Sequence, residues 1–211
     1  SPEFNLFLES KNKKKSNSNT ILFIDDVMEG SFDYKLGYLV DKNKKAKNYW
    51  DPVDKLCDFI KKKFPNNKLL IAAHHRRNEY DIPIRRKFIF DKTCQLIKNS
   101  KLILCHNSLA CQLAVLFRKP IIFIDTDYIK SLRYYSHVMI TNLSKALGSQ
   151  IINISKNFKP NKKIFETIKS ATINEKKYEK YEKNYISYPG LKSYGRWKTV
   201  LKYLERVEFN K

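Results

Sequence analysis

The chain has 211 residues, with 42 Lys and Arg against 21 Asp and Glu, so its formal net charge is +21. Its 42% hydrophobic content is typical of one globular core. No stretch approaches the roughly 20 apolar residues of a membrane-spanning helix, and the four cysteines form no C-x-x-C pair, which predicts buried thiols rather than a zinc site or a disulfide framework.

The composition divides the chain into three segments. Residues 1–4 resemble a cloning remnant, and the Lys/Asn/Ser-rich stretch that follows has too few apolar residues to order itself, so we expect residues 1–19 to be unstructured. Residues 20–160 are predicted to form one domain. Residues 161–211 are predicted to form a helical tail packed on it.

Five short apolar runs predict the strands of a buried sheet. They are continuous rather than alternating, as in parallel strands covered on both faces. The runs are Ile21 to Ile24, Leu69 to Ala73, Leu102 to Cys105, Ile121 to Ile124, and Ile151 to Ile154.

Helical patterns separate these runs. Asp51 and Pro52 predict the start of a helix over 52–64, and Gly148 predicts the end of a helix over 130–147. Shorter helices are predicted over 92–98 and 109–117, and tail helices over 164–171, 177–186 and 197–207. The alternation predicts an α/β fold with a doubly wound, mostly parallel, five- to six-stranded Rossmann-like sheet.

Polar residues follow four of the predicted strands, where an open α/β sheet binds its ligands. They are Asp25 and Asp26 after the first, His74, His75, Arg76 and Arg77 after the second, His106, Asn107 and Ser108 after the third, and Asp125 and Asp127 after the fourth.

Two of these clusters predict a phosphate site. Asn107 and Ser108 precede an apolar helix, whose first N–H groups favour an anion; alternatively, they only cap that helix. The run from His74 to Arg77 offers donors for a diphosphate, although such side chains are also common in solvated loops.

The aspartates have a second set of predicted roles. Asp25 and Asp26 are candidates to orient hydroxyls or act as a catalytic base, and Asp125 and Asp127 to bind the ribose or base of a nucleotide. Capping of the following segments is the alternative for each. Neither a P-loop nor a G-x-G-x-x-G fingerprint is present, so we expect no metal and no cofactor other than a substrate nucleotide.

Residues 70–77, 92–100, 102–110 and 119–124 together resemble the C-terminal domain of GT-B glycosyltransferases from bacterial surface-polysaccharide clusters. The resemblance covers about residues 21–154 and is to the sialyltransferase and Kdo-transferase types in particular. It implies that His74 contacts the nucleotide phosphate and that Asn107 and Ser108 form the polar pair at a helix start. His75 stands where the family motif has proline, and Asn107 where it has a hydroxyl.

The expected function is therefore the donor half of a metal-independent glycosyltransferase, with a CMP- or UDP-linked sugar as substrate, a glycan or glycolipid acceptor, and a missing N-terminal half that supplies the base. Its expected location is cytoplasmic, with the basic surface in peripheral contact with an anionic inner membrane. A nucleic-acid-binding module that uses Tyr178, Tyr181, Tyr185 and Tyr188 is a less favoured alternative. A nucleotide-sugar epimerase or hydrolase of the same fold is another.

Overall fold

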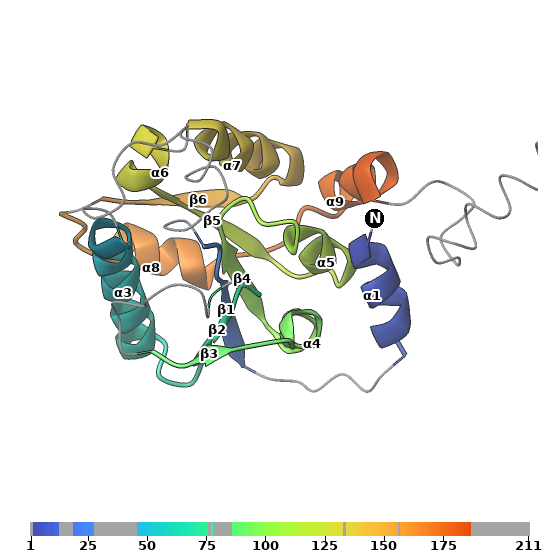
Figure 1. Ribbon diagram of the computed structural model, residues 1–211, viewed down its shortest axis with the longest axis horizontal. Helices are drawn as coiled ribbons and strands as arrows, with labels where there is room; N and C mark the ends of the chain where they lie inside the picture. The colour runs from blue at the N-terminus through green and yellow to red at the C-terminus, as the bar shows by residue number, and fades with distance from the viewer. Residues whose placement is uncertain are drawn as a thin grey trace, which may run out of the picture.

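A computed structural model describes residues 2–12, 19–27, 46–75, 77, 86–132, 134–155 and 157–186. Six parallel strands form one sheet in the order β3-β2-β1-β4-β5-β6, with helices on both faces (Figure 1). The strands are β1 (Thr20–Ile24), β2 (Lys68–Ala72), β3 (Phe88–Ile89), β4 (Leu102–Cys105), β5 (Ile121–Thr126) and β6 (Gln150–Ile154). The predicted α/β, Rossmann-like fold is confirmed.

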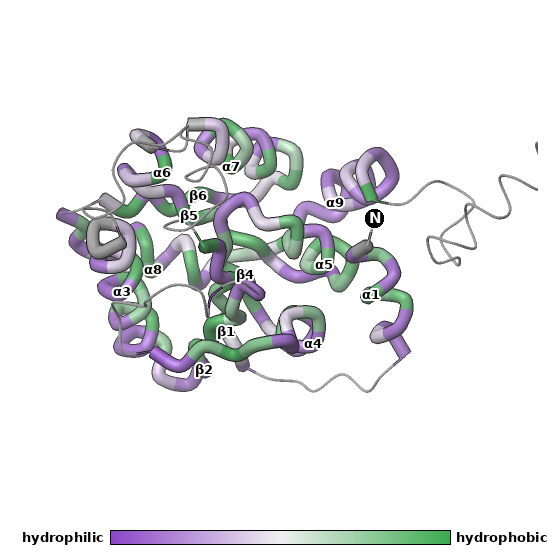
Figure 2. The backbone as a smooth tube through the Cα atoms, viewed as in Figure 1, coloured by the Kyte–Doolittle hydropathy of each residue, from purple (hydrophilic) through white to green (hydrophobic). Residues whose placement is uncertain are grey.

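The central strands form the core because their side chains are covered on both faces. Every residue of β1, β4 and β5 is buried, and Figure 2 shows the apolar residues concentrated in the sheet, with polar residues along the outer sides of the helices. The only strand that the sequence analysis missed in the described part is β3, whose two residues pair with Ile71 and Ala72. Two residues are too short a run to give a periodic signal.

Helices cover the two faces unequally. The helices are α1 (Pro2–Ser10), α3 (Ala46–Lys63), α4 (Thr93–Asn99), α5 (Cys111–Leu116), α6 (Asp127–Leu132), α7 (Tyr134–Leu147), α8 (Lys162–Lys169), α9 (Glu175–Tyr181) and the π-helix η2 (Glu182–Ile186). On one face α8 lies beside α3, where the rings of Phe64 and Phe165 stack at 5.0 Å. On the other face lie α4, α5 and α7, with α1 against α4 and α5 (Figure 1).

The expectation that residues 1–19 are unstructured is wrong for residues 2–12. They contain α1, whose Phe4 is only 7% exposed and whose Phe7 ring lies 5.1 Å from that of Phe117. The ammonium of Lys98 donates to the Ser10 carbonyl at the end of α1, at 2.6 Å. Apolar side chains at helical spacing thus have a surface on α4 and α5 to pack against, which the composition of the segment did not reveal. Residues 13–18 lie outside the described part.

Two predicted helix boundaries are also corrected. Helix α3 begins at Ala46 and runs through Pro52 instead of starting there, because Tyr49 and Trp50, both fully buried, extend its apolar face into the core. The helix predicted over 130–147 is two helices, α6 and α7. Its predicted end is confirmed, since Gly148 adopts φ +66°.

The described part of the tail packs on the domain. Tyr178 is 1% exposed, and its hydroxyl donates to the Lys119 carbonyl at 2.9 Å, while Glu182 pairs with Arg118 at 2.8 Å. Tyr185, in contrast, is 67% exposed. The predicted helix over 197–207 and Tyr188 lie outside the described residues. Among the described helices, none has the length and apolar character needed to cross a membrane.

A candidate ligand site at the carboxyl edge of the sheet

A pocket of about 580 Å³ opens at the carboxyl ends of β1, β2 and β4. Six of the residues selected from the sequence line it, namely Asp25, Asp26, His74, His75, Asn107 and Ser108. Strands β1 and β4 are neighbours in the sheet although two strands separate them in sequence. The chain leaving β1 continues to β2 on one side, and the chain leaving β4 continues to β5 on the other side. Such a switch point is where open α/β sheets bind ligands.

His74 and His75 both line the pocket, with ring centroids 4.1 Å apart. The backbone N–H of His74 donates to Asp25 Oδ2 at 3.1 Å, which fixes the start of this loop. Partial burial, followed by the neighbouring His75, lowers the pKa of His74 below its ordinary value of 6.5. The unliganded His74 ring is therefore mainly neutral at pH 7.

Ser108 lies opposite the histidines, in the turn that leads from β4 into α5. Its Oγ accepts from the Ala110 N–H at 3.3 Å, and its carbonyl accepts from the Cys111 N–H at 3.0 Å. The Ser108 side chain thus closes the turn before α5 and does not cap the helix, whose N-cap is Ala110; Ser108 also lines the pocket. Helix α5 itself begins at Cys111, two residues later than predicted.

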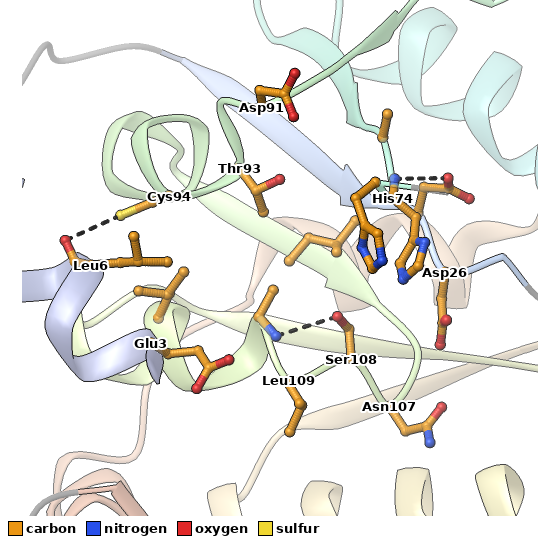
Figure 3. Close-up of a pocket in the computed structure, with 16 residues that line it drawn as sticks. Glu3, Leu6, Asp26, His74, Asp91, Thr93, Cys94, Asn107, Ser108 and Leu109 are labelled. Atoms are coloured by element: carbon orange, nitrogen blue, oxygen red, sulfur yellow. Dashed lines mark hydrogen bonds between the residues drawn. The ribbon is translucent and has the colours of Figure 1, made fainter. Parts of the chain in front are cut away.

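Asn107 borders the pocket but points its side chain away from the histidines (Figure 3). Its Oδ1 is buried and has no hydrogen-bond partner among the described residues. A buried acceptor without a partner costs about 1–3 kcal/mol. The position is therefore one where an incoming donor would be stabilising.

Arg77 does not face the pocket. Its Nε and Nη2 donate to the two carboxylate oxygens of Asp25 at 2.8 and 2.5 Å, and neither side chain is exposed. The predicted phosphate contact from Arg77 and the predicted base role of Asp25 are both at odds with this arrangement, because each group is committed to the other. Asp26 is the accessible carboxylate after β1. Arg76 lies outside the described residues.

His106 is a core residue rather than a ligand contact. It is fully buried, and its Nδ1 lies 2.6 Å from the Ile124 carbonyl while its Nε2 lies 2.8 Å from the Tyr49 hydroxyl. A carbonyl only accepts, so Nδ1 carries the proton and Nε2 accepts from Tyr49. Burial lowers the pKa of His106. The ring links β4 to β5 and α3.

The aspartates at the end of β5 and at the start of α6 also differ from expectation. The carboxylate of Asp125 is 2% exposed; Oδ1 accepts from the Thr126 N–H at 2.9 Å, and Oδ2 lies 2.8 Å from His137 Nδ1. Asp127 is exposed in the first turn of α6, and the side chain that caps this helix is that of Thr126, whose Oγ1 accepts from the Ile129 N–H at 2.9 Å. His137 was missed in the sequence analysis because a single histidine inside a helical pattern gives no signal of its own.

The rest of the pocket wall comes from α1 and the segment before α4. These residues include two further carboxylates, Glu3 and Asp91, and the polar side chain of Thr93. The exposed side chains of Leu6 and Leu109, 46% and 69% accessible, mark the apolar part of the rim. The described lining therefore has hydroxyl, imidazole and carboxylate groups, suited to a polar ligand with hydroxyls.

No protein-family model matches the chain, and no curated protein matches it in sequence. Among the described residues, no three His, Cys, Asp or Glu side chains are grouped so that they could hold a metal ion.

Proposed function

We propose that this domain binds the nucleotide-sugar donor of a metal-independent GT-B glycosyltransferase of bacterial surface-polysaccharide synthesis, with a CMP- or UDP-linked sugar. The observation that carries the proposal is the convergence of His74, Asn107 and Ser108 on one pocket at the switch point of the sheet. These are the residues that the family resemblance assigns to the nucleotide. The pocket volume lies within the roughly 300–1,000 Å³ usual for small-molecule sites.

In this proposal the donor phosphate lies between His74 and Ser108. The Ser108 hydroxyl can rotate to donate to a phosphate oxygen, and the His74 ring gains a proton when an anion binds beside it. Donors held in place before the reaction stabilise the charge that develops on the leaving phosphate. Asp26, half-buried in the same pocket, is a carboxylate that can accept from a sugar hydroxyl.

The acceptor is a glycan or glycolipid, and the protein approaches it at an anionic inner-membrane surface. Four exposed lysines gather where α3 and α8 meet, and we call them the α3–α8 basic patch: Lys61, Lys62, Lys63 and Lys169. The Lys169 ammonium lies over the Phe165 ring, which stacks on Phe64 directly after α3. Clustered lysines of this kind favour anionic lipid.

A nucleotide panel tests the proposal. Thermal shift and calorimetry with CMP, UDP, GDP and their sugars should identify one preferred nucleotide, which at 100 times its dissociation constant stabilises the domain by about 2.7 kcal/mol. Ser108→Ala and His74→Ala should each weaken binding about tenfold, as loss of a charge-assisted hydrogen bond does. Ser170→Ala is the matched control, because this exposed serine bonds only the Glu166 carbonyl in α8 among the contacts described.

Other results would replace the proposal. Failure of every nucleotide to bind at millimolar concentration contradicts it, as does full binding by Ser108→Ala. Strongly salt-dependent binding of any oligonucleotide, without nucleotide binding, would favour the nucleic-acid-binding alternative. Release of free sugar in the absence of an acceptor would favour the hydrolase or epimerase alternative.

A further inference from the structure

Charged and polar side chains follow one another in a fixed order along the carboxyl edge of the sheet. Asp91 follows β3, His74 and His75 follow β2, Asp26 follows β1, and Ser108 follows β4. These strands are neighbours in that same order, and all five residues line the candidate pocket. The imidazoles therefore have a carboxylate on each side, and Figure 3 shows His74 between Asp91 and Asp26.

No described cation neutralises these two carboxylates. The neighbouring Asp25 is paired with Arg77, but no ion pair or hydrogen bond joins Asp26 or Asp91 to another described residue. Lysine and arginine, which number 42 in the whole chain, are absent from the described lining of the pocket. In a strongly basic protein, the described part of this pocket is thus acidic.

The proposed position of the phosphate determines what the sugar meets. A phosphate between His74 and Ser108 uses the imidazole and the hydroxyl as donors. Asp26 and Asp91 each follow a strand that is next to β2, and neighbouring strands are about 4.8 Å apart. A sugar joined to this phosphate therefore approaches a carboxylate whether it extends along the edge toward β1 or toward β3.

We infer that the sugar of the donor is uncharged, and that Asp26 and Asp91 accept its hydroxyls and exclude sugars that carry a carboxylate. A hydroxyl that donates to a carboxylate makes a charge-assisted hydrogen bond, whereas a carboxylate on the sugar meets a like charge. Sialic acid and Kdo are both carboxylic acids, so the inference departs from the transferase types that the sequence resembles. It rests on the proposed nucleotide site and narrows the substrate class of that site.

Matched pairs of donors isolate the effect of charge. UDP-glucose and UDP-glucuronate differ only at C6, where a hydroxymethyl group replaces a carboxylate, and UDP-galactose and UDP-galacturonate form a second pair. In calorimetry the intact chain should bind the neutral member of each pair about tenfold more tightly, as for like charges about 6 Å apart at a partly exposed site. High salt should reduce this preference by screening. CMP-linked sialic acid should bind no more tightly than CMP.

Asp26→Asn and Asp91→Asn each remove one charge and keep the size of the side chain. Asp91 has φ +56°, a conformation that asparagine also adopts readily, so this variant should fold normally. Each variant should bind the uronates about threefold more tightly than the unsubstituted chain does, and the double variant should bind both members of each pair equally. Glu179→Gln, at an exposed position of α9 outside the described lining, removes the same charge and should retain the full preference.

The outcomes separate the inference from the proposed function. Three results overturn the inference alone: uronates that bind the intact chain as tightly as the neutral sugars, CMP-linked sialic acid that binds more tightly than CMP, and a full preference in the double variant. Equal loss of the preference in Glu179→Gln also overturns it, since net charge would then be responsible. Absence of any nucleotide binding by the intact chain removes the proposed function and the inference with it.

Discussion

Arg77 and Asp25 form a two-pronged ion pair in the interior of the domain, with neither side chain exposed. The guanidinium lies 5.1 Å from the Trp50 ring and 5.7 Å from the Phe88 ring. The pair therefore joins the segments after β1 and β2 to β3 and α3. It supports the edge of the pocket that Asp25 lines.

Removal of one partner should destabilise the fold strongly. Arg77→Met leaves the Asp25 carboxylate buried without its main partner, which costs about 3–5 kcal/mol. Urea unfolding followed by circular dichroism measures this loss. In the double variant Arg77→Met/Asp25→Asn the loss should be smaller, because no charge remains buried. A stable Arg77→Met protein that had lost nucleotide binding would instead place this arginine in the ligand site.

His106 should make stability depend on pH. Burial lowers its pKa below the ordinary 6.5, so the folded protein disfavours the proton that the unfolded chain accepts. Its contribution to the unfolding free energy is complete above pH 6.5 and is lost as the pH falls through the folded pKa, at up to about 1.4 kcal/mol per pH unit.

The matching variant is His106→Phe. It should be less stable at every pH, by about 1–3 kcal/mol, because the hydrogen bonds that the His106 ring makes to the Tyr49 hydroxyl and the Ile124 carbonyl are lost, yet its stability should fall less steeply below pH 6.5. Urea titrations at several pH values measure both effects. Parallel pH curves for the two proteins would contradict the assignment of the slope to His106.

The proposed phosphate contact of His74 makes affinity depend on pH. Its pKa is lowered in the free protein, and a bound phosphate favours the protonated ring, so binding takes up a proton. Nucleotide affinity should therefore increase as the pH falls from about 8 to 6, by less than tenfold per unit. Calorimetry in buffers of different ionisation enthalpy measures the proton uptake. His74→Gln should abolish it; uptake that persists in this variant would exclude His74.

The α3–α8 basic patch is expected to bind anionic vesicles. Replacing Lys61, Lys62 and Lys63 by Gln should weaken binding to phosphatidylglycerol-containing vesicles by about 3 kcal/mol at low salt, since each basic residue near the surface contributes about 1 kcal/mol. Vesicle sedimentation measures this. The control replaces Lys145, Lys176 and Lys180, also exposed, on α7 and α9. Equal weakening in both variants would mean that net charge, rather than the patch, controls binding.

The sheet could be predicted from sequence because its signal is local. Apolar runs of four or five residues, interrupted only by Asn153 in the last run, identified β1, β2, β4, β5 and β6. The parallel arrangement of the strands also predicted that the polar residues directly after them lie together at the carboxyl edge of the sheet. Helix α1 was missed because its burial depends on a distant surface, shown by the contact of Phe7 with Phe117.

The roles of the charged residues could not be predicted in the same way. Asp25 and Arg77 are far apart in sequence, and the sequence does not show whether an arginine after a strand faces a ligand or a buried carboxylate. The same holds for Asp125, whose partner His137 lies on a helix. These pairings depend on side-chain packing: they engage the Asp25 carboxylate at the edge of the pocket, and they hold Arg77 and Asp125 outside its described lining.

Helix α5 lies between the first and the last described elements of the chain. On one side Phe117, directly after α5, packs against Phe7 of α1, and on the other Arg118 binds Glu182 of η2. The turn that carries Asn107 and Ser108 leads directly into this helix. A fusion partner or affinity tag joined at residue 1 is therefore attached next to α1, which packs against α5, the helix that directly follows the candidate ligand site. Tag position becomes an experimental variable in any affinity measurement on this protein.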